Sequence, residues 1–345
     1  MIHNYCRRLP NATIENEFTW RFENTYYFQN HYLDSLFTNI FSFWGHYGVV
    51  IFVFLSGYGL VKKYEFEAQN IFQAKAFIKN HYTKLTILLF GGTTLYWITN
   101  YILHNELKEI NFYQIVAQLT YIVNIIPMKY LGIYPGPYWY FGMTMELYIL
   151  YILIIYKKKN IVTVSVCIIC LLTLCLSNGH YQMLTWLKLN FIGSFLPFTI
   201  GILFARAKLP IPHIPPKTSN IIIEKASLIT LGCIFIIPIL IFEMNFYLWL
   251  LSSIPILCFA ICIVKLYHGI HTSIAEKIGR TSNILFVIHP IIREIPLTYK
   301  YYMDNYPLLI LFVYIGLTFI FTIPFKIYLS YANKLFQSKI SERTP

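Results

Sequence analysis

Residues 43–63 read FWGHYGVVIFVFLSGYGLVKK, and this stretch decides the class of the protein. It carries no lysine, arginine or carboxylate before Lys62, and its apolar run is long enough to cross a bilayer as a helix. His46 stands near its start, the pair Ser56-Gly57 lies inside it, and two lysines close it. The stretch therefore predicts a membrane helix with a polar group at each end.

The composition of the whole chain agrees with a membrane protein. Of its 345 residues, 57% are hydrophobic and 12% are charged, whereas a soluble domain carries about a quarter charged residues. Loops between the apolar runs are short, so we expect an all-α fold in one domain over residues 1–345, a polytopic membrane helix bundle of about nine transmembrane helices. The runs lie at about 40–61, 85–103, 137–156, 161–177, 189–205, 221–242, 247–267, 282–298 and 308–330.

The basic residues predict how the chain is oriented. The net charge is +12, and lysines and arginines gather on the cytoplasmic side of membrane proteins. Nearly all basic loops fall on one side if the first span runs inward and the more polar run 112–127 does not cross. We therefore expect 112–127 to be interfacial or re-entrant, residues 1–35 to be extracytoplasmic and 331–345 to be a cytoplasmic basic tail. An outer N-terminus without a signal peptide predicts one more helix before Met1, which would make ten spans.

Several other classes of function are disfavoured. No basic run has the aromatic interleaving needed for base stacking, so we expect no nucleic-acid partner. Cys167 and Cys170 have CxxC spacing, but they lie in an apolar run without a second ligand pair, so we expect no metal site. There is no Walker loop or dinucleotide fingerprint, and we expect no bound cofactor.

Four motifs in order resemble the integral-membrane acyltransferase-3 family. HYGVVIFVFLSGYGLV at 46–61 resembles its GV-x-x-FF-x-x-SG-[FY] signature, and FIKNHYTKL at 77–85 resembles the basic stretch before its next helix. YWYFGMTMELYILY at 138–151 resembles its W-x-L-x-x-E-x-x-Y helix, and NILFVIHPII at 283–292 its YLIHxP-like helix. Members of this family move acyl groups from acyl-CoA onto surface sugars. The resemblance therefore implies a membrane O-acyltransferase.

The resemblance also implies two catalytic residues. The family has a histidine at the outer end of its first helix, and MIHNY at 1–5 places His3 there, although the helix and its preceding arginine are missing. His3 would take the hydroxyl proton of the acceptor, since an imidazole titrates near neutral pH. Glu146 lies inside an apolar helix, where a carboxylate usually faces a partner or a cavity. It would orient or charge the catalytic histidine or bind the acceptor, and a structural hydrogen bond between helices is the alternative.

A cytoplasmic basic cluster suits the phosphates of acyl-CoA. Lys79, His81 and Lys84 lie just inside the expected membrane boundary and would bind those phosphates as point charges. The family often has arginines there, so the bidentate binding of phosphate is lost in this chain. Ordinary positive-inside lysines are the alternative interpretation.

Five further residues are expected to line the cavity of the acceptor. His289 and Arg293 lie one helical turn apart and could hold a phosphate of CoA or of a lipid-linked sugar, although Arg293 could instead extend to the interface. His46 is expected near the outer surface, Ser56 at a close helix contact and Trp139 at packing or interfacial positions.

Taken together, these features predict a multi-pass O-acyltransferase of a bacterial plasma (inner) membrane. Acyl-CoA, acetyl-CoA in particular, would be the co-substrate, and a hydroxyl of a glycan or lipid-linked sugar the acceptor. A transporter of polysaccharide or lipid-linked sugar is the alternative from another class, since it too carries charges within its spans. It should show related halves, and none is visible in the sequence. A truncated, inactive relative of the family is a third possibility.

Overall fold

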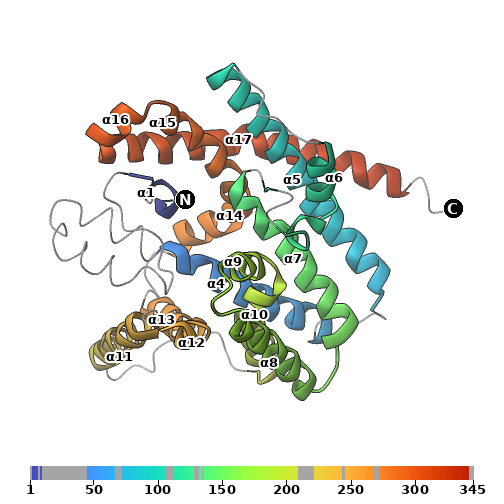
Figure 1. The fold of residues 1–345 in the computed structure, drawn as a ribbon, viewed down its shortest axis with the longest axis vertical. Coiled ribbons are helices and arrows are strands. Elements are labelled where there is room, and N and C mark those ends of the chain that lie inside the picture. The colour runs from blue at the N-terminus through green and yellow to red at the C-terminus, as the bar shows by residue number, and fades with distance from the viewer. Residues whose placement is uncertain are drawn as a thin grey trace.

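The computed structural model is helical throughout the part of the chain that it describes, and this part contains no strand. The prediction of an all-α fold is therefore confirmed (Figure 1). Most of the expected extracytoplasmic segment 1–35 lies outside the described residues. The structure describes residues 2–6, 8–9, 45–66, 72–105, 112–127, 132–133, 135–208, 221–242, 245–266 and 272–341.

The helices vary from single turns to one of 35 residues. Two of them, η2 and η5, are π-helical, and η1, η3 and η4 are 3₁₀ turns. In chain order they are α1 (Ile2–Cys6), η1 (Gly45–Tyr47), α4 (Gly48–Val61), η2 (Lys62–Phe66), α5 (Ala74–His104), α6 (Phe112–Leu119), η3 (Ile122–Asn124), η4 (Gly136–Tyr138), α7 (Trp139–Leu150), η5 (Tyr151–Ile155), α8 (Asn160–Leu176), α9 (Tyr181–Leu189), α10 (Phe191–Arg206), α11 (Ile221–Phe242), α12 (Phe246–Trp249), α13 (Ser253–Leu266), α14 (Thr272–Ile292), α15 (Glu294–Thr298), α16 (Lys300–Asn305) and α17 (Pro307–Ser341).

The number of membrane spans differs from the expected nine. Among the described residues, three helical stretches are long and apolar enough to cross a membrane, namely 136–155, 225–242 and 307–335. The pair α9 and α10, bent by 45° at its break, gives up to a fourth. Nine spans are therefore not confirmed. Several expected spans form shorter helices, such as α8 and α13, and part of the expected first span lies outside the described residues.

The run 112–127 forms a short helix and a 3₁₀ turn. Its helix α6 has eight residues, about 12 Å of length at the usual rise, against roughly 30 Å of hydrocarbon. Phe112 and Tyr113 are exposed, whereas Gln114 and Gln118 face the protein, where Gln118 donates to Thr93 at 3.5 Å. This inverted amphipathicity suits a short helix whose outer face meets lipid, and it agrees with an interfacial or re-entrant segment.

Helices α4 and α10 pack closely because glycines lie at their contact. A Cβ atom on Gly57 would collide with the backbone carbonyl of Phe198, and one on Gly201 with that of Phe54. Small residues allow this approach in membranes, where dispersion contacts hold helices together. The expectation of close packing at Ser56-Gly57 thus has a geometric basis at Gly57.

Helices α4, α7 and α10 run in the same direction. Arg206 at the end of α10 donates hydrogen bonds to Glu65, beyond α4, and to the carbonyl of Ile155 in η5, so their C-terminal ends meet. Asn124 donates to the carbonyls of Trp139, at the start of α7, and of Leu189, just before α10, so these two N-terminal ends meet as well. The bundle therefore has two distinct ends.

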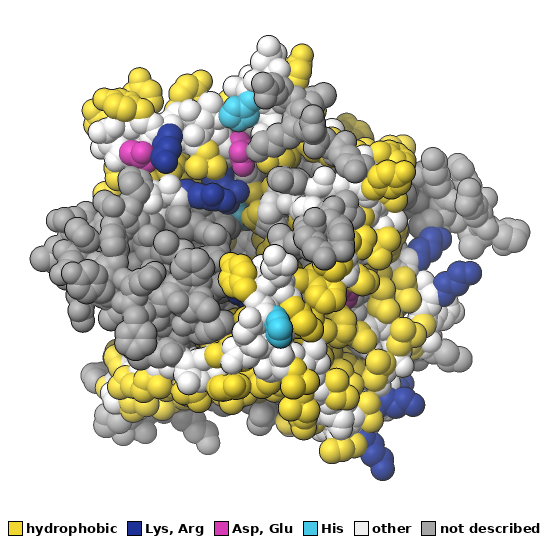
Figure 2. Space-filling view, in the orientation of Figure 1, with side chains coloured by type: hydrophobic (Ala, Val, Ile, Leu, Met, Phe, Trp, Pro, Cys, Tyr) yellow, Lys and Arg dark blue, Asp and Glu magenta, His cyan; other side chains and the backbone are white. Residues whose placement is uncertain are grey.

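One end carries the lysines that follow α4, η5 and α10, and we call it the lysine end. Helix α5 starts there, because its His81 contacts Tyr64 of η2. Lys and Arg side chains gather along the lower right edge of the view in Figure 2, beside a largely apolar surface. We call the opposite end the distal end. The lysine end is defined by Lys62, Lys63, Lys157, Lys158, Lys159 and Lys208.

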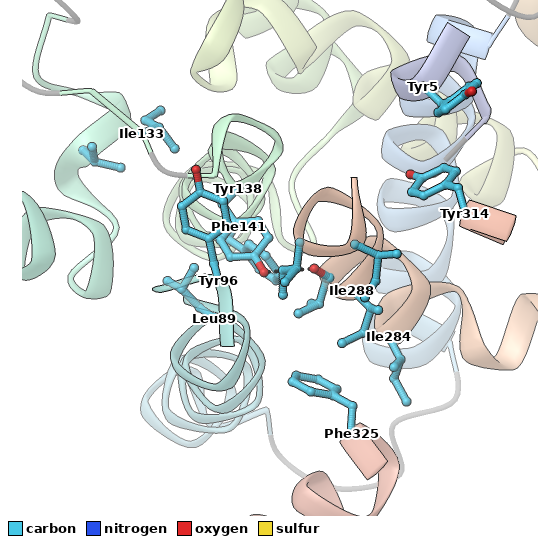
Figure 3. Close-up of a cluster of buried hydrophobic side chains, with 14 of the residues drawn as sticks. Tyr5, Leu89, Tyr96, Ile133, Tyr138, Phe141, Ile284, Ile288, Tyr314 and Phe325 are labelled. Carbon is cyan, nitrogen blue, oxygen red and sulfur yellow. Dashed lines mark hydrogen bonds between the residues drawn. The ribbon is translucent and has the colours of Figure 1, made fainter. Parts of the chain in front are cut away.

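A second packing core joins α5, α7, α14 and α17 (Figure 3). The Tyr138 hydroxyl donates to the Val287 carbonyl at 3.0 Å, which fixes the start of α7 against α14. Tyr5 of α1 stacks on Tyr314 of α17 with ring centroids 5.5 Å apart. This core places the first described helix next to the C-terminal half of α14.

Candidate functional site

A buried ion pair lies at the lysine end. Arg206 donates from Nη2 to Glu65 Oε1 at 2.7 Å and from Nε to Glu65 Oε2 at 2.9 Å, and their side chains are 9% and 8% exposed. The Tyr151 hydroxyl donates to the same Oε1 at 3.0 Å. Both oxygens of this carboxylate are therefore occupied.

The remaining donors of the Arg206 guanidinium reach the neighbouring helices. They bond the Ile155 carbonyl at 2.9 Å, Asn160 Oδ1 at 3.2 Å and Thr163 Oγ1 at 3.3 Å. Sequence reasoning treated Arg206 as one more positive-inside residue and missed Glu65. The available signal was a carboxylate directly after the first apolar run, in a loop otherwise rich in lysine.

His81 lies in an aromatic cluster beside this ion pair. Its Nε2 is 3.2 Å from the Tyr64 hydroxyl, and its ring centroid lies 4.3 Å from that of Phe77 and 4.6 Å from that of Tyr148. Burial, and then the charges of Lys84 and Lys63, lower the pKa of His81 from 6.5 to about 4. The imidazole is therefore neutral near pH 7 and meets a ligand as a hydrogen-bonding ring.

The two lysines expected to act with His81 lie on the same helix. Lys79 and Lys84 are exposed on α5, within one turn of His81 on either side. Lys63 Nζ lies 5.2 Å from the centroid of the Tyr64 ring. The lysine end thus combines exposed cations with one neutral, partly buried imidazole.

Aromatic side chains and one hydroxyl connect this end with the middle of the bundle. Ser56 Oγ donates to the Phe52 carbonyl at 3.0 Å, and the hydroxyls of Tyr140 and Tyr148 lie close enough to Ser56 to exchange hydrogen bonds. Tyr148 is the same residue whose ring contacts His81. Ser56 therefore serves at a polar contact between α4 and α7, next to the close packing at Gly57.

The line of contacts continues from Tyr140 to α14. Its ring centroid lies 5.2 Å from that of Phe286, which lies 5.7 Å from the imidazole of His289. His289 is 2% exposed, and its Nδ1 lies 3.0 Å from the Leu285 carbonyl. Because a carbonyl only accepts, Nδ1 carries the proton and Nε2 is the basic nitrogen of the neutral ring.

Arg293 follows one turn after His289 and is also buried. Its Nη2 lies 3.9 Å from Glu294 Oε1, and both side chains are largely shielded from solvent. The Tyr314 hydroxyl donates to the His289 carbonyl at 3.2 Å, which ties this turn of α14 to α17. In this structure Arg293 is held inside the protein beside a carboxylate.

Glu146 lies at the break between α9 and α10. Its Oε2 accepts a hydrogen bond of 2.8 Å from the Phe191 N–H, in the first turn of α10, where the helix dipole favours an anion. Asn190 caps the same helix by accepting from the Ile192 N–H at 2.9 Å. Glu146 Oε1 is buried and has no hydrogen-bond partner in the structure.

The two remaining histidines of the predicted site have their backbone at the distal end. His3 lies in α1 and His46 in η1, and α1 packs against both η1 and α17. Their side chains lie outside the part that the structure describes. Trp139, half-buried at the start of α7, accepts a hydrogen bond at its carbonyl from Asn124 at 2.7 Å.

Apart from Ser56, which lies between them, the structure thus separates the predicted residues into two sets, at opposite ends of the bundle. Within the described ranges, no group of three or more His, Cys, Asp or Glu side chains is arranged to hold a metal ion. Asn124 and Glu65 are the residues that sequence reasoning missed. Asn124 Oδ1 lies against Gly142, where an added Cβ would collide with it, and Asn124 also donates to the Trp139 carbonyl. These two contacts hold η3 against α7.

Comparison with protein families gives one match. The model of the acyltransferase 3 family, described as an acyltransferase domain, matches residues 19–328. This match covers most of the chain, including both ends of the bundle and the four motifs that resemble the same family. No curated protein matches the chain, and neither does a solved structure.

Proposed function

Because the chain belongs to the acyltransferase 3 family of membrane proteins, we propose that it moves an acyl group, acetyl in particular, from acyl-CoA to a hydroxyl of a glycan or lipid-linked sugar. The observation that carries the finer proposal is the division of the bundle into a lysine end and a distal end. Cations suited to phosphate lie at the lysine end, whereas histidines and a buried carboxylate lie at the distal end.

The donor binds at the lysine end. Lys79 and Lys84 are exposed on α5 and free to move onto the phosphates of CoA, for which ammonium groups serve as point charges. The positive-inside tendency puts this end in the cytoplasm, where acyl-CoA is made, and we assign the protein to a bacterial plasma (inner) membrane. The thioester then points along the contacts from His81 through Tyr148 towards Tyr140.

The acceptor binds at the distal end. His3 takes the proton of the attacking hydroxyl, and Glu146 Oε1 accepts a hydrogen bond from the acceptor. The hydroxyl oxygen forms a bond to the acyl carbon, the bond from that carbon to sulfur breaks, and the CoA thiolate takes up a proton. His46, Trp139, His289 and Arg293 line the acceptor side, and Ser56 lies between the two substrates.

A transporter of lipid-linked sugars is the second candidate. The observation that favours it is the break of 45° between α9 and α10, since transporters bind substrates at discontinuous helices. Glu146 lies at that break, so both functions would depend on the same carboxylate.

The experiment measures the O-acetyl content of surface glycans in native cells after chromosomal changes of His3→Ala and Glu146→Gln. A positioned base contributes roughly 10²–10⁴ in rate, so we expect acetyl groups to fall to background in an otherwise normal glycan. Glu276→Gln, at a carboxylate 61% exposed, is the matched control and should leave acetylation unchanged.

The other outcomes separate the alternatives. Glycan missing from the surface, with normal acetylation of what remains, would favour the transporter. Unchanged acetylation and unchanged glycan in both variants, in a protein that is inserted in the membrane, would leave only the inactive relative.

A further inference from the structure

We propose that Glu65 and Arg206 are a positioning pair for the acyl-CoA site and that they act on it through Tyr64 and His81. This inference rests on the proposed function and adds two residues that neither the motifs nor the charge pattern singled out. The ligand part concerned is neutral and polar, and we assign it to the amide groups of the pantetheine arm of CoA.

The ion pair between Glu65 and Arg206 has a complete set of hydrogen bonds. The guanidinium of Arg206 makes five hydrogen bonds, two to Glu65 and one each to Ile155, Asn160 and Thr163. A planar guanidinium group with this many hydrogen bonds is held in one orientation. Arg206 therefore fixes Glu65 relative to the ends of α7, α8 and α10.

Because Glu65 belongs to η2, fixing Glu65 also fixes η2. This segment is π-helical, a rare geometry that is common at functional sites, and none of its five residues is fully buried. Its apolar packing rests on Tyr64, whose ring contacts Phe72 and Phe77. The hydrogen bond from the Tyr156 hydroxyl to the Tyr64 carbonyl, at 3.3 Å, supports the same turn from η5. Without the ion pair, η2 would lose its strongest connection to the bundle.

Tyr64 links η2 to the imidazole of His81. Tyr64 is next to Glu65, its hydroxyl lies 3.2 Å from His81 Nε2, and its ring centroid lies 4.8 Å from that of Phe77. A phenol that donates to Nε2 selects the tautomer with the proton on Nδ1. His81 then offers an N–H donor, as a neutral ring, to a ligand that enters beside Lys79 and Lys84.

A neutral ring held in one tautomer suits an amide carbonyl better than a phosphate. Charged groups of the ligand have the exposed lysines of α5 as partners, whereas His81 lies deeper, among Phe77 and Tyr148. The pantetheine arm carries two amides between the phosphates and the thiol. Its path from the lysine end inward would bring one of them past His81.

The test measures the Kd of coenzyme A for the full-length protein in lipid nanodiscs, which requires no knowledge of the acceptor. We expect Glu65→Gln to raise this Kd about tenfold and Tyr64→Phe, which leaves the ion pair intact, to raise it by a similar factor. Because both changes act through one contact, the double variant should raise it no further than the larger single change. Glu276→Gln, in the exposed pair with Arg280, is the matched control.

Three results would decide against the inference. Tyr64→Phe with an unchanged Kd, or multiplicative effects of the two changes, would show that the pair holds the fold without positioning His81. A Glu65→Gln protein that melts at lower temperature but binds normally would lead to the same conclusion. Failure of the wild-type protein to bind coenzyme A would instead overturn the proposed function itself.

Discussion

Glu65 and Glu146 are both buried carboxylates, one at each end of the bundle, and they differ in how fully they are bonded. Glu65 has Arg206 on both oxygens and Tyr151 on one of them. Glu146 has one N–H on Oε2 and nothing on Oε1. A carboxylate completed by the protein acts through the groups that it holds in place, whereas an acceptor left open inside the protein costs free energy until a ligand supplies the donor.

The irregular backbone segments at the two ends of the bundle differ in the same way as the two carboxylates. At the lysine end, π-helical η2 and η5 bring Glu65 and the Ile155 carbonyl onto the Arg206 guanidinium, and the Tyr151 hydroxyl onto Glu65. At the distal end, the break at Asn190 opens the start of α10 towards Glu146. The irregular backbone at the lysine end closes a hydrogen-bond network within the protein. The break at the distal end presents the Phe191 N–H to Glu146, whose other oxygen has no partner.

The largest effect is expected from Arg206→Ala. Removing the guanidinium leaves Glu65 as a buried charge without its partner, which typically costs about 3–5 kcal/mol of unfolding free energy. Denaturant unfolding of the purified protein in detergent measures this cost. Arg280→Ala breaks an exposed pair with 3.7 Å between the charged atoms and should change stability by less than about 1 kcal/mol. Equal effects of the two changes would remove the basis for treating the lysine end as a structural network.

The next largest loss of stability is expected from Gly201→Ala, at the contact between α4 and α10. The new Cβ would collide with the Phe54 carbonyl and push α4 away from α10, at a cost of about 1–3 kcal/mol. Gly59→Ala is the matched control, because a Cβ there has nothing within 4 Å. In a helix that control should be neutral or stabilising by up to about 1 kcal/mol. Thermal unfolding of both variants measures the difference, and equal melting temperatures would contradict the close packing.

Local patterns were enough to predict the helical class and the lysines that follow the apolar runs. Each of these depends on neighbouring residues, such as the apolar run before Lys62. The partnership of Glu65 with Arg206 joins residues 141 positions apart, and no local pattern reveals it.

His81 and Glu146 show the same limit at the candidate site. The sequence makes His81 one member of a basic cluster, and only the packing of Phe77 and Tyr148 around it shows that it is neutral. The cost of burial predicts a functional or structural partner for Glu146 without naming it. The partner is a backbone N–H, because α10 begins at Phe191.

Glu146→Gln tests the comparison of the two buried carboxylates at the distal end. The amide oxygen of glutamine can still accept the Phe191 N–H, so we expect unfolding free energy to change by less than about 1.5 kcal/mol. The open oxygen becomes an amide donor, and transfer of acetyl groups should fall by at least tenfold. A loss of stability as large as that of Arg206→Ala, with activity intact, would show that Glu146 holds the fold and does not act on the acceptor.

The smallest effect concerns the pH dependence of stability at His81. Its folded pKa of about 4 lies below the unfolded value of 6.5, because burial and Lys84 disfavour the charged ring. The unfolded chain therefore binds more protons between these values, so the contribution of His81 is complete above pH 6.5 and is lost as the pH falls towards 4. The melting temperature of the wild type should therefore fall relative to that of His81→Gln as the pH is lowered from 6.5 towards 4.

His180→Gln is the matched control for that measurement, since His180 is exposed before α9, near the distal end. Its melting temperature should follow that of the wild type at every pH. If His81→Gln also follows the wild type, the ring is open to solvent and charges normally in the folded protein. Tyr64 would then have no neutral imidazole to hold, and the lysine end would resemble a simple cationic surface more than a positioned site.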